Sequence, residues 1–154
     1  MTKYLAIGIA SLAIGIFYMT RQNLNVRNNN PLNIRENGTQ WEGKTGHNKG
    51  FVKFESVEMG FRAAYKTLMT YRNNYGLDSI SDIISRWAPD SENHTENYIA
   101  YIRQKMNIEP NAFNFWSDTV PDERYPELML HMANMEGAKG AFSIEQAERG
   151  VALA

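Results

Sequence analysis

The stretch NNPLNIRENGTQWEG, residues 29–43, interrupts an otherwise helical pattern and decides the fold class. Within it, Asn37-Gly38 is a dipeptide that favours a tight turn between antiparallel strands. We therefore expect two short strands, around 33–35 and 39–41, joined at this turn. A further strand is expected at 51–54, where aromatic and β-branched residues flank a lysine. The stretch thus predicts a small antiparallel sheet near the beginning of the domain.

Beyond this sheet, the apolar residues recur at steps of three and four, which is the spacing of amphipathic helices. Ser79 and Asp82 have the spacing of a capping box, and Ser143 and Gln146 start the last helical pattern. The pattern predicts helices over 57–71, 79–87 and 95–106, one leading to Gly137, and one over 143–151. The fold class expected is therefore mainly α, of α+β type, with one small antiparallel sheet.

An uncharged apolar segment, residues 4–19, lies between Lys3 and Arg21. Its length and flanking charges predict an N-terminal transmembrane helix with a single pass. A cleaved signal peptide is the alternative, but no small-residue cleavage site follows the segment. We expect a membrane anchor at 1–20, a polar tether at 21–30 and a globular domain at 31–154. The location expected is a membrane, either inside a virion or the inner membrane of the host.

Composition restricts the function. The 154 residues suit one soluble domain, and a formal net charge of −1 disfavours nucleic acid as a partner. The chain has no cysteine, so disulfides, thiolate zinc sites and cysteine nucleophiles are excluded. His47, His94 and His131 lack the spacing of metal ligands, and we expect no metal and no cofactor.

Several motifs occur in a familiar order: residues 29–35 with 41–43 and 51–54, then 60–63, then 86–98. Together they resemble a family of small phage virion structural proteins that look like lysozyme-fold cell-wall lytic enzymes. Met135-Glu136-Gly137 and residues 143–154 also resemble the end of that family's chains. The asparagine-proline motif is similar to bacterial cell-wall glucosaminidases, in which a catalytic glutamate ends the helix before the hairpin. The resemblance implies a lysozyme-like domain and peptidoglycan as a partner.

No glutamate precedes Glu36 in this chain, so the glucosaminidase order is absent. Glu136 follows an apolar helical face, where loss of solvent would keep a carboxyl protonated for general acid catalysis. We therefore hypothesise that Glu136 supplies the acid from the other end of the chain, as in a permuted copy. Glu36 is the candidate for a second carboxylate, which hydrolytic glycosidases add and lytic transglycosylases do not need.

Aromatic and basic residues of the motifs are candidates for binding sugars. Trp41 and Tyr98 can stack on sugar rings, and Arg35 lies within the asparagine-proline motif. Aromatic residues at helical spacing are more often part of the core, and Trp87 is predicted to be a core residue for that reason. The predicted substrate-binding residues are therefore Trp41, Arg35 and Tyr98.

Two functions remain open at this point. The first is a membrane-anchored phage enzyme of lysozyme or lytic transglycosylase type, which cleaves glycan strands during genome entry or host lysis. The second is an inactive, minor virion structural protein that keeps the lysozyme-like fold and associates with a membrane. The expected partners are peptidoglycan, a lipid membrane and other virion proteins.

Overall fold

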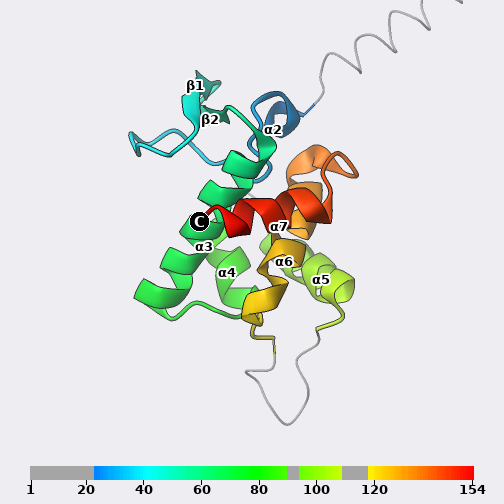
Figure 1. The fold of residues 1–154 in the computed structure, drawn as a ribbon. Helices are drawn as coiled ribbons and strands as arrows, with labels where there is room; N and C mark the ends of the chain where they lie inside the picture. The colour runs from blue at the N-terminus through cyan, green and yellow to red at the C-terminus, as the bar shows by residue number, and fades with distance from the viewer. Residues whose placement is uncertain (1–22, 90–93, 109–117) are drawn as a thin grey trace, which may run out of the picture.

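The computed structural model describes residues 23–89, 94–108 and 118–154 (Figure 1). This part of the chain is mostly helical and carries one two-stranded antiparallel sheet, as the sequence predicts. The strands are β1 (Lys44–Asn48) and β2 (Phe51–Phe54). The helical elements are α2 (Leu24–Arg27), α3 (Val57–Tyr75), α4 (Ile80–Trp87), α5 (Thr95–Met106), η1 (Asp122–Arg124), α6 (Tyr125–Ala133), η2 (Asn134–Ala138) and α7 (Ile144–Ala152).

The transmembrane part of the predicted fold class requires correction. Among the residues that the structure describes, no helix has the length and apolarity needed to cross a bilayer. The predicted anchor, residues 1–20, lies outside the described residues. The fold class is therefore a mainly helical domain with one small sheet. The predicted membrane localisation depended on the same helix and is therefore not supported.

The segment predicted as a tether also differs from expectation. Residues 24–27 form α2, and three asparagines that follow or belong to this helix are buried: Asn25, Asn28 and Asn30. The amides of Asn25 and Asn30 donate to backbone carbonyl oxygens that no regular strand or helix pairs, and the Asn28 Oδ1 accepts from the Asn48 amide. These residues therefore pack as part of the domain.

The predicted hairpin at Asn37-Gly38 is wrong, because the tight turn lies at Lys49-Gly50 between β1 and β2. Both residues of this turn have positive φ, at 52° and 82°, which a two-residue turn of type I′ requires. Only Gly38 has a positive φ in the predicted turn. The strand predicted at Phe51–Phe54 is confirmed as β2.

The side-chain amide of Asn30, which is 0% exposed, joins the segment after α2 to the sheet. Its Nδ2 donates to the carbonyl oxygens of Ile34 and Val52 at 3.0 and 2.9 Å, and its Oδ1 accepts from the Ile34 N–H at 2.8 Å. Asn29 adds a bond from Nδ2 to the Phe54 carbonyl at 3.1 Å. These bonds fix residues 29–35 against β2.

Helix α3 runs through the middle of the domain, and α7 lies across it (Figure 1). The two helices approach closely because a glycine stands at Gly150, where a Cβ would overlap the Cβ of Phe61. A second glycine, Gly60, lets α3 contact the asparagine-proline segment. A Cβ at Gly60 would overlap the carbonyl oxygen of Asn29 and the ring of Pro31.

Replacing Gly60 by alanine tests this contact. Alanine favours a helix by about 1 kcal/mol over glycine. Nevertheless, the overlap with the Asn29 carbonyl should make Gly60→Ala less stable by about 2–3 kcal/mol. Unfolding in urea measures the difference. The exposed helical substitution Gln104→Ala serves as control and should change stability by less than about 0.5 kcal/mol. A Gly60→Ala protein as stable as the parent would contradict the proposed packing.

Candidate functional site

A cavity of about 440 Å³ opens between the loop after Pro31, the start of β2, α3 and the end of α4. Glu136, from η2 near the far end of the chain, forms part of its wall. The residues that line it are Leu32, Asn33, Ile34, Arg35, Asn37, Trp41, Phe51, Thr67, Tyr71, Trp87 and Glu136. We call it the central cavity.

The carboxyl group of Glu136 is surrounded by hydrogen-bond donors from distant parts of the chain. Trp87 Nε1 donates to Oε1 at 3.3 Å, and the Tyr98 hydroxyl lies 3.4 Å from the same oxygen. Asn33 Nδ2 donates to Oε2 at 3.4 Å and lies 3.3 Å from the Glu136 carbonyl oxygen. Gly137, with φ of 102°, turns the backbone directly after this residue. The carboxyl is therefore held in one orientation at the cavity wall.

Burial raises the pKa of Glu136 above its ordinary value of 4.5. The donors Asn33, Trp87 and Tyr98 and the charge of Arg35 act in the opposite direction, since they favour the ionised form. Loss of solvent is the larger effect. A carboxyl in this state retains its proton to a higher pH than an exposed glutamate and can deliver it to a bound ligand.

The structure brings most of the predicted site residues together. Arg35 and Trp41 line the central cavity with Glu136. Tyr98 is 4% exposed, and its hydroxyl also lies 3.2 Å from the Met132 carbonyl oxygen. Burial raises the pKa of this hydroxyl well above its usual value, so it stays protonated. Tyr98 therefore orients Glu136, and its role in binding a sugar stays a prediction.

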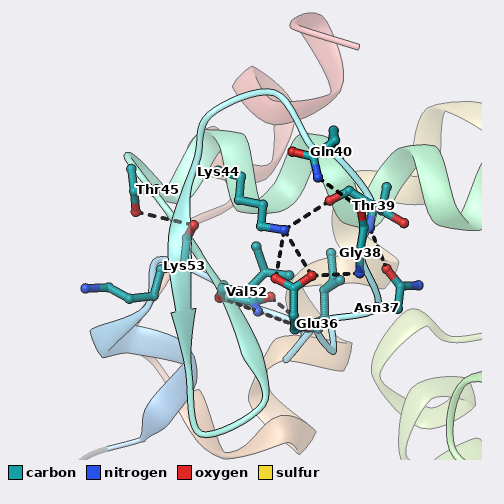
Figure 2. Close-up of polar contacts among 11 residues, drawn as sticks. Glu36, Asn37, Gly38, Thr39, Gln40, Lys44, Thr45, Val52 and Lys53 are labelled. Atoms are coloured by element: carbon teal, nitrogen blue, oxygen red, sulfur yellow. Dashed lines mark hydrogen bonds and ion pairs between the residues drawn. The ribbon is translucent and has the colours of Figure 1, made fainter.

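Glu36, the second predicted acid, is not among the residues that line the central cavity. It forms an ion pair with Lys44, at 2.8 Å between Nζ and Oε2, and accepts from the Gly38 N–H at 2.8 Å (Figure 2). Lys44 also donates to the Thr39 carbonyl at 3.2 Å. The hydrogen bond from Lys44 lowers the pKa of Glu36. Glu36 thus closes the loop between 36 and 44, and its catalytic role stays a prediction.

Two residues that contact Glu136 were not predicted as site residues. Trp87 was expected in the core, and it does pack against it, with its ring 6.4 Å from that of Tyr71. However, it also lines the central cavity and donates to Glu136. Asn33 was seen only as part of a strand. Asn33 belongs to the motif at 29–35 and Trp87 to the motif at 86–98. These two motifs are the feature of the sequence that could have identified both as site residues.

No group of three or more histidine and carboxylate side chains within 23–89, 94–108 and 118–154 is arranged to hold a metal ion. Within these ranges, the chemistry available at the central cavity is that of one carboxyl with a raised pKa, hydrogen-bond donors and aromatic rings.

The raised pKa of Glu136 predicts a specific dependence of stability on pH. The folded state holds this proton more strongly than the unfolded chain, so ionisation favours unfolding. The stability of the parent relative to Glu136→Gln should therefore be highest below about pH 4 and fall as the pH rises through and above 4.5. Urea unfolding of both proteins at pH 4 and pH 7 measures this. A stability difference that does not change with pH would contradict burial of the carboxyl.

Comparison with known proteins gives one informative relative, and no family model matches the chain. The sequence is 37% identical over 150 residues to Protein P5 of Pseudoalteromonas phage PM2, which covers 94% of this chain and 88% of the relative. The name of this relative states no enzymatic activity. This relative therefore supports the predicted similarity to phage proteins. It does not support the predicted similarity to lysozyme-like hydrolases. The chain belongs to the family of phage Protein P5.

Proposed function

We propose that this chain is a phage virion protein whose central cavity cleaves the glycan strands of peptidoglycan. The similarity to Protein P5 of phage PM2 supports the virion part. One observation carries the enzymatic part: the Glu136 carboxyl is partly buried at a cavity wall, its pKa is raised, and three donors from different segments fix its orientation. A neutral carboxyl in a fixed orientation is what a general acid requires.

In this reaction Glu136 gives its proton to the glycosidic oxygen as the bond from that oxygen to the anomeric carbon breaks. The resulting carboxylate is stabilised by Trp87, Tyr98 and Asn33, the same groups that contact the protonated form. It can then take a proton from the group that attacks the anomeric carbon, either water or a hydroxyl of the sugar itself. Among the described residues that line the central cavity, Glu136 is the acidic one. A single acid suffices for this sequence of proton transfers.

A second function has its own support. The comparison with Protein P5, whose name carries no activity, favours an inactive virion structural protein more than it favours an enzyme. In that case the contacts of Trp87, Tyr98 and Asn33 with Glu136 would only join α4, α5 and the loop after Pro31 to η2. Other virion proteins would then be the partners, and the cavity would be left over from an enzymatic fold.

Substitution of Glu136 separates the two functions. Glu136→Gln keeps the size of the side chain but cannot deliver the proton, so release of fragments from dye-labelled peptidoglycan should fall by about a hundredfold or more. The melting temperature should show that the variant is folded.

Glu36→Gln and the exposed Glu123→Gln are the matched controls and should retain activity. An inactive Glu36→Gln beside an active Glu136→Gln would move the proton donor to the loop at 36–44. If the parent releases nothing from the walls of several bacteria, the structural function is the correct one.

A further inference from the structure

A stack of one charged and two aromatic side chains joins the end of α4 to the end of α3. The guanidinium of Arg86 lies over two tyrosine rings, with its Cζ 4.9 Å from the ring centre of Tyr71 and 4.1 Å from that of Tyr75. Both distances lie within the roughly 6 Å over which a ring face attracts a cation. The two tyrosines are four residues apart on α3 and so share one face of that helix. We call Arg86, Tyr71 and Tyr75 the arginine stack.

The arginine stack leads to one of the donors of the acid. The ring of Tyr71 is 6.4 Å from that of Trp87, with an interplanar angle of 59°, and rings at this separation attract each other. Trp87 follows Arg86 in the sequence and donates from Nε1 to Glu136 Oε1 at 3.3 Å. Tyr71, Trp87 and Glu136 line the central cavity together. The contact of Arg86 with Tyr71 is thus connected to the carboxyl through one further ring.

We propose that Arg86 is a positioning residue, which stacks on Tyr71, fixes the last turn of α4 and so holds the Trp87 indole N–H against the Glu136 carboxyl. This inference rests on the proposed function, because it names a residue that prepares the acid of that reaction. In this role Arg86 acts through the position of Trp87 and does not itself contact the ligand.

The burial pattern of α4 shows why its last turn depends on such a contact. The first part of this eight-residue helix is fixed by Ile80, Ile83 and Ile84, each 0% exposed. Beyond Ile84, Arg86 is exposed and Trp87 is only partly buried. Helix ends fray where little holds them. The arginine stack supplies the contact that keeps this end, and Trp87 with it, in one position.

The charge of Arg86 and its stacking can be separated by substitution. Burial raises the pKa of the Tyr71 hydroxyl, and the charge of Arg86 acts in the opposite direction, so the guanidinium interacts with this tyrosine electrostatically as well. A lysine keeps the charge but lacks the planar group that stacks on a ring. Arg86→Lys therefore removes the stacking and retains the charge.

A double-mutant cycle tests whether Arg86 acts through Trp87. The full-length proteins compared are the parent, Arg86→Gln, Trp87→Phe and the double variant, since phenylalanine keeps an aromatic ring but has no N–H. In each protein, the pKa of Glu136 is measured by NMR from the signal of its side-chain carboxyl carbon over a pH titration. The absence of this signal in Glu136→Gln assigns it.

The matched control removes a similar contact elsewhere on α3. The guanidinium of Arg72 lies 6.0 Å from the ring centre of Tyr125, which does not line the central cavity. Arg72→Gln therefore removes the same charge and the same kind of contact without affecting Trp87. It should leave the pKa of Glu136 unchanged.

Arg86→Gln should raise the pKa of Glu136 by about 0.5 to 1, the effect of weakening one hydrogen bond to the ionised carboxyl. Arg86→Lys should raise it similarly, and the double variant should match Trp87→Phe alone. On dye-labelled peptidoglycan, Arg86→Gln should lower kcat by about fivefold, as expected for one lost hydrogen bond, with little change in KM.

Two results would overturn the positioning role and leave the proposed function intact. One is additive effects of Arg86→Gln and Trp87→Phe on the pKa, because residues that act independently add. The other is the parent's pKa in Arg86→Lys, which would show that the charge acts and the stacking does not. If the pKa effects are coupled as expected but the parent cleaves no peptidoglycan, the proposed function fails while the positioning of Trp87 by Arg86 stands.

Discussion

The hydrogen bonds of the Asn30 side chain are the constraint on which the rest of the structure depends. This amide, which is 0% exposed, joins Ile34 to Val52 and so fixes the loop after Pro31 against β2. Gly60 then lets the same segment contact α3 without overlap. Loops without regular backbone pairing need such side-chain partners to hold one conformation. Through this loop, Asn30 sets the position of Asn33, which donates to Glu136.

At Glu136, burial and hydrogen bonding act in opposite directions. Burial favours the neutral carboxyl, whereas its three donors favour the charged one. The Glu136 carboxyl therefore stays neutral to a higher pH than an exposed glutamate. Its ionised form is still stabilised by the three hydrogen-bond donors. A general acid needs both properties, because it must first give a proton and then carry the charge. The partners come from 38 to 103 residues earlier in the chain, so only the folded chain brings them to Glu136.

A glycan-cleaving enzyme and an inactive structural protein place different physical demands on this member of the Protein P5 family. A structural protein can use this carboxyl as a hydrogen-bond acceptor that joins α4, α5 and the loop after Pro31 to η2, but burial makes its ionisation unfavourable for the fold. An apolar side chain in the same place would pack without that cost. An enzyme needs the carboxyl despite the loss of stability. The energetic disadvantage of Glu136 is thus the physical argument for the proposed activity.

The sequence by itself determined the features that depend on near neighbours. Helical periodicity and the caps at Ser79 and Ser143 predicted the main helices, and the apolar face before Glu136 predicted a carboxyl whose pKa is raised by burial. Only the tertiary structure decided which turn forms the hairpin. It also decided that Lys44 forms an ion pair with Glu36 and that Trp87 donates to Glu136. Spacing along a chain encodes contacts within a few residues, whereas the contacts of Glu136 join segments that only folding brings together, and the choice between two possible tight turns depends on how the flanking residues pack.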